Sequence, residues 1–268
     1  MRHSSRVEQA NAAMRKPLSV FLDTSVLKAS VDTRLVLVPE PKKVKWGDRE
    51  LELEVYRPVF VNQNTKFLRQ GRRDRFADTV ALRFIAALAK EGKIDLLVHQ
   101  EVFFELWGLP RTLGGGPLFY GAPIRKVEGP IHYGRVVVDG TRRDHQYEFL
   151  AGVDHPRFKE LQRSCGAYQG VDKPPHPNQL VDAFHVWCAE SASADYFLTL
   201  DDKLIRVFAS GPRQKTIVVP ITPLRLMRAL VRRHPTWLWS TLREAHRFAK
   251  SGRDLAAPMQ DASRAFFR

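Results

Sequence analysis

The sequence predicts an α/β protein in which a central, mostly parallel sheet is covered by helices on both faces, in three layers. Apolar runs with the length of buried strands recur along the chain, and segments with the helical spacing of apolar residues separate them. This alternation is typical of crossover units that connect parallel strands. The 268 residues, of which 44% are hydrophobic, are enough to form one large core.

The first strand is expected within the apolar run PLSVFLD, residues 17–23, which follows a polar and flexible N-terminus at residues 1–16. From residue 31 to 71 apolar and polar residues alternate with a period of two, and Gly47 and Asp48 separate two such runs. This pattern predicts an antiparallel β-hairpin inserted after the first strand.

Residues 72–91 have apolar residues at helical spacing, and the next strand is expected in IDLLV at residues 94–98. Residues 109–135 are dense in glycine and proline, which predicts a long loop. This loop opens a second insertion, at about residues 109–156, with a short strand expected at 135–139.

A helix at residues 177–192, with Asn178 as its cap, leads into an apolar strand at 195–202. This strand ends in acidic residues, as the first strand does. A further strand is expected at residues 216–220.

Residues 17–220 are therefore expected to form the main domain, and residues 221–268 a C-terminal helical extension. The first helix of the extension has Thr222 as its cap and Pro223 at its first position, and the last helix spans about 236–250. Four arginines of the first helix form either a phosphate-contacting surface or an ordinary solvated face. They are Arg225, Arg228, Arg232 and Arg233.

The net charge of the chain indicates which class of partner it binds. The chain carries 43 Lys and Arg residues against 29 Asp and Glu residues, a formal net charge of +14. Such an excess favours attraction to polyanions, so nucleic acid is the expected partner, and a basic but inert surface is the alternative. No apolar run is as long as a membrane span, and the N-terminus lacks the apolar segment of a signal peptide. With only Cys165 and Cys188, which lack metal-ligand spacing, the chain is expected to be cytoplasmic with reduced thiols.

Four acidic residues are expected to meet at one edge of the sheet. Asp23 and Asp201 each end an apolar strand, and the carboxyl ends of parallel strands share one rim, where ligands bind. Asp182, in the first turn of its helix, and Glu105, in the helix after the second strand, can project over the same rim. Their mutual repulsion predicts a bound cation. Oxygen ligands without a nearby cysteine favour Mg²⁺ or Mn²⁺ over zinc.

Some of these residues also have a simpler interpretation. Asp23 could cap a helix that begins at Thr24. Asp182 could be present only because its negative charge stabilises the N-terminal end of its helix. His185 follows Asp182 by three residues and lies on about the same helix face. We expect a partly buried histidine with a local partner there, and we leave it outside the catalytic set.

For two of the four acids a neighbouring acid is an alternative. Glu101 could take the place of Glu105, which we prefer because Leu-Trp-Gly follows it. Asp202 could take the place of Asp201, which we prefer because Thr199 stands two positions before it.

A divalent ion held by such acids suits the hydrolysis of phosphodiester bonds. The ion would polarise the scissile phosphate, lower the pKa of a bound water and stabilise the leaving oxygen. A basic surface would hold the polyanionic substrate.

Four segments of the chain, FLDTSVL, QEVFFEL, LVDAFHVWCAE and FLTLDDKL, resemble in this order the acidic motifs of PIN-domain nucleases, the fold shared by VapC-like toxin ribonucleases. The resemblance covers residues 18 to about 220, and the insertions make this chain longer than the short toxins. It implies a PIN-like fold, endoribonuclease activity, and hydroxyl groups of Thr24 and Ser25 that assist metal or water placement. It also implies one or two Mg²⁺ or Mn²⁺ ions bound by Asp23, Glu105, Asp182 and Asp201.

The expected function is therefore that of a metal-dependent endoribonuclease with RNA as its substrate. A toxin role with an antitoxin protein as partner, and a homodimer, stay open. Two alternatives remain, a non-catalytic nucleic-acid-binding module with a PIN-like fold and a nuclease that acts on DNA. A phosphatase with an aspartyl nucleophile is disfavoured, because it would need a second aspartate where Ser25 stands.

Overall fold

A computed structural model describes residues 17–30, 33–46, 49–62, 72–106, 118–131, 142–170, 173–209 and 216–235. Its centre is a sheet of five strands in the order β5-β4-β1-β6-β7, in which every neighbouring pair is parallel. This confirms the α/β class and the parallel sheet. The strands are β1 (Leu18–Leu22), β4 (Ile94–His99), β5 (Ile124–Val127), β6 (Tyr196–Leu198) and β7 (Val219–Ile221).

The order of the strands contains a topological switch point between β1 and β6. From β1 the chain adds β4 and then β5 on one side, and it returns to add β6 and β7 on the other side. The direction of growth therefore reverses between β1 and β6, and in open α/β sheets ligands bind at such a reversal. Phe21 and Phe197 stack with ring centroids 5.8 Å apart and join the two strands in the core.

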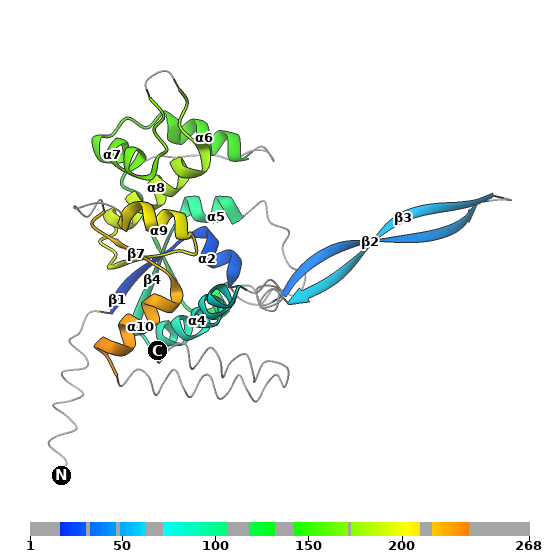
Figure 1. Cartoon of the computed structure of the whole chain (residues 1–268), viewed down its shortest axis with the longest axis horizontal. Coiled ribbons are helices and arrows are strands. Elements are labelled where there is room, and N and C mark those ends of the chain that lie inside the picture. Colours follow the sequence, from blue (N-terminus) through cyan, green and yellow to red (C-terminus); the bar gives the residue numbers. More distant parts are fainter. Residues whose placement is uncertain are drawn as a thin grey trace, which may run out of the picture.

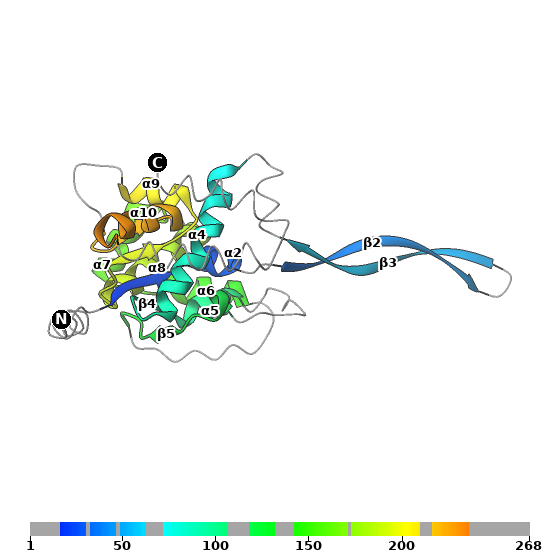
Figure 2. The same ribbon diagram turned by 90° about the horizontal axis from the view of Figure 1, so that it is seen from below.

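Helices cover both faces of the sheet (Figures 1 and 2). α4 and α10 pack against each other on one face, and α8 lies on the other face with α6 and α7 packed against it. The helices are α2 (Thr24–Ala29), α4 (Arg73–Lys90), α5 (Gln100–Leu106), α6 (Arg142–Ala151), α7 (Pro156–Cys165), α8 (Pro177–Ser191), α9 (Asp202–Ala209) and α10 (Pro223–Arg233). In the part of the chain that the structure describes, none of the helices combines the length and hydropathy needed to cross a membrane.

The predicted hairpin is confirmed. β2 (Thr33–Trp46) and β3 (Arg49–Asn62) have 14 residues each and pair antiparallel along their whole length. The hairpin extends away from the body of the molecule (Figure 1). Leu53 and Val55 are 47% and 43% exposed, so this ribbon carries apolar side chains at its surface.

Several helix boundaries agree with the sequence analysis. The helix expected at 72–91 is α4, whose Phe76, Val80 and Phe84 are buried at helical spacing. In α10 the Thr222 side chain accepts a hydrogen bond from the backbone N–H of Arg225, and Pro223 occupies the first turn, as predicted.

Other elements differ from expectation. The loop predicted at 109–135 contains a 3₁₀ turn at Leu118–Gly121 and the edge strand β5, which pairs with β4. α6, α7 and α9 were not predicted. The helix α8 begins after His176 with Pro177 in its first turn, so the prediction of Asn178 as its cap was wrong.

Some predictions fall outside the described residues. They are the flexible N-terminus at 1–16, residues 109–117 and 132–135 of the predicted loop, the strand at 135–139 and the helix at about 236–250.

Candidate active site

Asp23 lies at the carboxyl end of β1 and is 7% exposed. It occupies the N-cap position of α2, yet its side chain makes no capping hydrogen bond. Its Oδ2 instead accepts hydrogen bonds from the hydroxyl groups of Ser25 and Thr199, the latter at 2.8 Å. The geometry therefore does not support helix capping as the role of the Asp23 side chain.

The ends of β1 and β6 are joined by a network of hydroxyl groups. The backbone N–H of Asp23 donates to the carbonyl of Leu198 at 3.0 Å. The backbone N–H of Leu200 donates to Ser25 Oγ at 3.0 Å, and that of Asp201 donates to Thr199 Oγ1, also at 3.0 Å. This network fixes the Asp23 carboxylate and brings the segment that carries Asp201 beside it.

Asp201 caps a helix. Its Oδ1 accepts hydrogen bonds from the backbone N–H groups of Lys203 at 2.7 Å and Leu204 at 3.1 Å, so it caps α9. The neighbouring Asp202 turns away and pairs with Arg75 of α4 at 2.7 Å. Of the two acids, Asp201 is the one that interacts electrostatically with Asp182.

His185 of α8 lies between two of the predicted acids. Its side chain is 1% exposed, with Nε2 3.1 Å from Glu105 Oε1 and Nδ1 3.7 Å from Asp23 Oδ1. The prediction of a local partner for His185 was wrong. Its partners are instead two acids of the candidate site, which come from β1 and α5.

Asp182 is the sixth residue of α8 and lies in its second turn, so the prediction that placed it in the first turn was wrong. The structure therefore does not support the interpretation that Asp182 serves only to stabilise the N-terminal end of the helix. Burial raises the pKa of Asp182, and the negative charges of Asp23, Asp201 and Glu105 raise it further, to about 7, against the opposing effect of His185. The charges of Asp23, Asp201 and Glu105 therefore act on Asp182. We call Asp23, Glu105, Asp182 and Asp201 the acid cluster.

The charges of Asp23 and His185 stabilise each other. Burial alone would raise the pKa of Asp23, but His185 and the hydroxyl groups of Ser25 and Thr199 lower it overall. Burial alone would lower the pKa of His185, but Glu105, Asp23 and Asp182 raise it to about 9. At neutral pH His185 is therefore an imidazolium inside the acid cluster.

From the sequence, the repulsion among four carboxylates predicts a bound cation. His185 supplies one positive charge, and Asp182 holds a proton part of the time near neutral pH because its pKa is about 7. The acid cluster can therefore exist without a metal ion, and repulsion alone does not imply one.

Glu101 and Glu105 have different surroundings. Glu101 is fully buried, and its Oε2 accepts a hydrogen bond from Gln146 of α6 at 2.9 Å. Glu105 is 16% exposed and lies against His185. Of the two, Glu105 is the acid that lies against the rest of the cluster.

The residues of the acid cluster are of the types that bind metal ions, but they are not arranged as a complete set of ligands. Among the described residues, no three His, Cys, Asp or Glu side chains are already arranged as metal ligands. The donors nevertheless suit Mg²⁺ or Mn²⁺, which prefer carboxylate oxygens. Glu105 Oε1 and both ring nitrogens of His185 make no well-aligned hydrogen bond within the described residues, although His185 Nε2 lies 3.1 Å from Glu105 Oε1 as an ion pair. A hard cation bound to Glu105 would therefore compete with His185 for this oxygen.

Comparisons of the chain with protein-family models, with curated proteins and with solved structures found no match. The resemblance to PIN-domain nucleases therefore depends on the four short motifs alone.

Proposed function

We propose that the protein is a metal-dependent endoribonuclease that hydrolyses phosphodiester bonds of RNA. The observation that carries the proposal is the acid cluster at the reversal of strand order, where the pKa of Asp182 is raised to about 7 by burial and by the other three acids. Titratable groups with strongly shifted pKa values in a ligand-binding crevice are typical of active sites. The PIN-like order of the four motifs supports the same class of nuclease.

The acids Asp23, Glu105, Asp182 and Asp201 would hold one or two Mg²⁺ or Mn²⁺ ions. When bound, such an ion supplies Lewis acidity toward the phosphate and lowers the pKa of water. Ser25 and Thr199 fix the orientation of the Asp23 carboxylate through their hydroxyl groups. Because Asp182 must lose its proton to act as a ligand, ion binding should strengthen as the pH rises through about 7.

His185 has a separate part in this proposal. As an imidazolium it offsets part of the negative charge that would repel an approaching phosphodiester. We therefore add it to the candidate site as a positioning residue for Asp23 and Glu105, which it contacts directly.

A positive net charge of +14 supports RNA as the partner, because polyanion binding is favoured by an excess of Lys and Arg. A toxin role with an antitoxin partner, and a homodimer, belong to the same proposal. Cytoplasmic location also belongs to it. Cys165 and Cys188 are buried free thiols, which is compatible with a reducing compartment.

A second candidate function is a nucleic-acid-binding module without catalysis. The charge of His185 favours it, because the acid cluster is partly neutralised without a metal ion. In that case RNA binding would need no divalent ion, and no cleavage would be seen. A nuclease that acts on DNA is a third candidate, and it differs from the first only in its substrate.

The test is cleavage of end-labelled single-stranded and structured RNA, and of DNA of the same sequence, with Mg²⁺, with Mn²⁺ or with EDTA. We expect RNA cleavage only with the divalent ion. The variants Asp23→Asn and Asp182→Asn should lose it, because each removes one carboxylate charge from the cluster. Asp154→Asn is the matched control, since Asp154 is exposed and pairs with Lys159 at the start of α7.

Undiminished cleavage by both cluster variants, or cleavage that persists in EDTA, would reject the proposal. RNA binding by the wild type without any cleavage would favour the non-catalytic module. Cleavage restricted to DNA would support the proposed active site, with DNA and not RNA as the substrate.

A further inference from the structure

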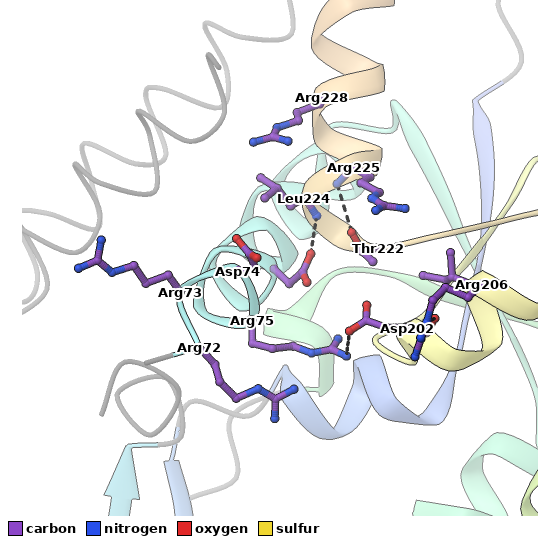
Figure 3. A pocket seen from close by; sticks show the side chains of 12 residues that line it. Arg72, Arg73, Asp74, Arg75, Asp202, Arg206, Thr222, Leu224, Arg225 and Arg228 are labelled. Atoms are coloured by element: carbon purple, nitrogen blue, oxygen red, sulfur yellow. Dashed lines mark hydrogen bonds and ion pairs between the residues drawn. The ribbon is translucent and has the colours of Figure 1, made fainter. Parts of the chain in front are cut away.

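A second polar site lies where three helices meet. The N-terminal ends of α4 and α10 and the helix α9 surround a pocket with a volume of about 690 Å³ (Figure 3). A volume of this order is typical of ligand sites in proteins. Six arginines line the pocket: Arg72, Arg73, Arg75, Arg206, Arg225 and Arg228. We call it the arginine pocket.

Three acids also line the arginine pocket, but two of them are engaged by the protein. Asp78 is buried, and its Oδ1 accepts a hydrogen bond from the backbone N–H of Leu224 at 3.0 Å. Asp202 pairs with Arg75 at 2.7 Å, as Figure 3 shows. Asp74 is the third acid. The lining therefore has an excess of three positive charges, six guanidinium groups against three carboxyl groups.

Three of the six arginines retain donor groups for a ligand. Arg75 is only 14% exposed, and its Nη1 is buried without a hydrogen-bond partner among the described residues. Arg73 and Arg225 are exposed, and within the described parts of the chain their side chains form no ion pair. A buried guanidinium nitrogen without an acceptor is costly unless a ligand or water supplies one.

We propose that the arginine pocket is a phosphate-binding site separate from the acid cluster. The planar guanidinium group offers paired donors that match phosphate oxygens. The N-terminal ends of two helices add positive dipoles at the same place. Six arginines from three helices spread this charge across the pocket, which suits several phosphates better than one.

The phosphates have two sources of the same chemistry, the backbone of a polynucleotide and the phosphate chain of a nucleotide. The position of the pocket favours the backbone. α9, which lines it, begins one residue after Asp201, and Thr222 in its wall directly follows β7 at the carboxyl rim of the sheet. The arginine pocket therefore adjoins the carboxyl rim of the sheet, and a polynucleotide that lies along this rim would reach both the pocket and the acid cluster. This choice of source depends on the proposed ribonuclease function, whereas the binding of phosphate does not.

The experiment measures binding of a short fluorescent RNA by anisotropy in EDTA, so that cleavage does not enter. The test variant combines Arg73→Ala and Arg225→Ala, both at exposed positions of the pocket. The control combines Arg232→Ala and Arg233→Ala, which remove the same charge from exposed positions of α10 outside the pocket. Circular dichroism and Tm confirm that both variants fold.

We expect the Kd of the test variant for RNA to rise by about tenfold at physiological salt, and its salt dependence to fall by about 1.4 in logarithmic slope, for two lost phosphate contacts. The control should change Kd much less. Equal losses in both variants, or no loss in either, would overturn the proposal. Tripolyphosphate serves as the second probe. If tripolyphosphate competes with RNA for the wild type and competes less well for the test variant, a short phosphate chain is enough for binding to the pocket. If tripolyphosphate does not compete with RNA, the pocket binds the RNA backbone.

The outcome is separable from the proposed catalysis. Asp23→Asn should bind RNA in EDTA at least as well as the wild type, because the pocket is intact. Suppose that the wild type fails to cleave RNA while the test variant still binds RNA more weakly than the control variant. That result would support the phosphate-binding site and reject the proposed nuclease activity.

Discussion

The charge of His185 makes a quantitative prediction. Glu105, Asp23 and Asp182 raise the pKa of this buried histidine from 6.5 to about 9. A tenfold change in proton affinity corresponds to about 1.4 kcal/mol, so the folded state favours the imidazolium by a net of about 3 kcal/mol, after burial has offset part of the effect of the acids. A group whose pKa is raised by folding stabilises the fold fully below its unfolded pKa. That stability is lost as the pH rises through the folded value, here between pH 6.5 and about 9.

The substitution His185→Gln removes this charge and keeps a polar side chain of similar size. We expect the free energy of unfolding to fall by about 2–3 kcal/mol at neutral pH, because Asp23 and Glu105 then lack their cationic partner. The wild type should lose stability across the window from pH 6.5 to about 9, and the variant should lack this part of the pH dependence. Urea unfolding followed by circular dichroism at several pH values measures both effects.

His99→Gln is the matched control. His99 is also buried, but burial, with the charges of His185 and Lys126, lowers its pKa to about 4. It is therefore neutral across the window in which His185 titrates. A variant of His185 that keeps the wild-type slope between pH 6.5 and 9, or a His99 variant that loses it, would refute the reasoning.

Two further predictions concern elements that support the sites. Thr222→Ala removes the side-chain cap of α10 and should lower the free energy of unfolding by about 1 kcal/mol, measured by urea unfolding. A change below the error of that measurement would contradict the capping role. Phe158→Ala should cost about 3–5 kcal/mol, because Phe158 is fully buried and stacks on Trp187 at 5.3 Å, which ties α7 to the helix that carries Asp182. Its Tm shift, compared with that of Phe158→Leu, measures the effect, and equal Tm values for Phe158→Ala and the wild type would contradict it.

The elements with a regular pattern could be predicted from the sequence. The hairpin has a period of two over both strands, and β1 and β6, which end just before Asp23 and Thr199, are short and apolar. β5 was missed because it has only four residues, and two of them, Arg125 and Lys126, are exposed and charged at the sheet edge. α7 did carry boundary signals, since Pro156 opens it and Gly166, with a φ of 78°, closes it in the left-handed conformation.

The candidate site shows the limit of sequence reasoning in another way. The four acids were found because each ends a strand or lies in a helix near the sheet edge. His185 was noticed on the same helix face as Asp182, but its charge depends on Glu105 and Asp23, which are distant in sequence. No local pattern reports such a partner. The arginine pocket was likewise visible only as the basic positions of α10, because α4 and α9 complete it in three dimensions.

The central claim is that the acid cluster binds a divalent cation, and direct titration with Mn²⁺ tests it without any substrate. Electron paramagnetic resonance of free Mn²⁺ should reveal one or two sites in the wild type and in Asp154→Asn, with binding that strengthens as the pH rises through about 7. Asp23→Asn should lose these sites. Equal Mn²⁺ binding by Asp23→Asn and the wild type, or no binding by the wild type, would contradict the claim.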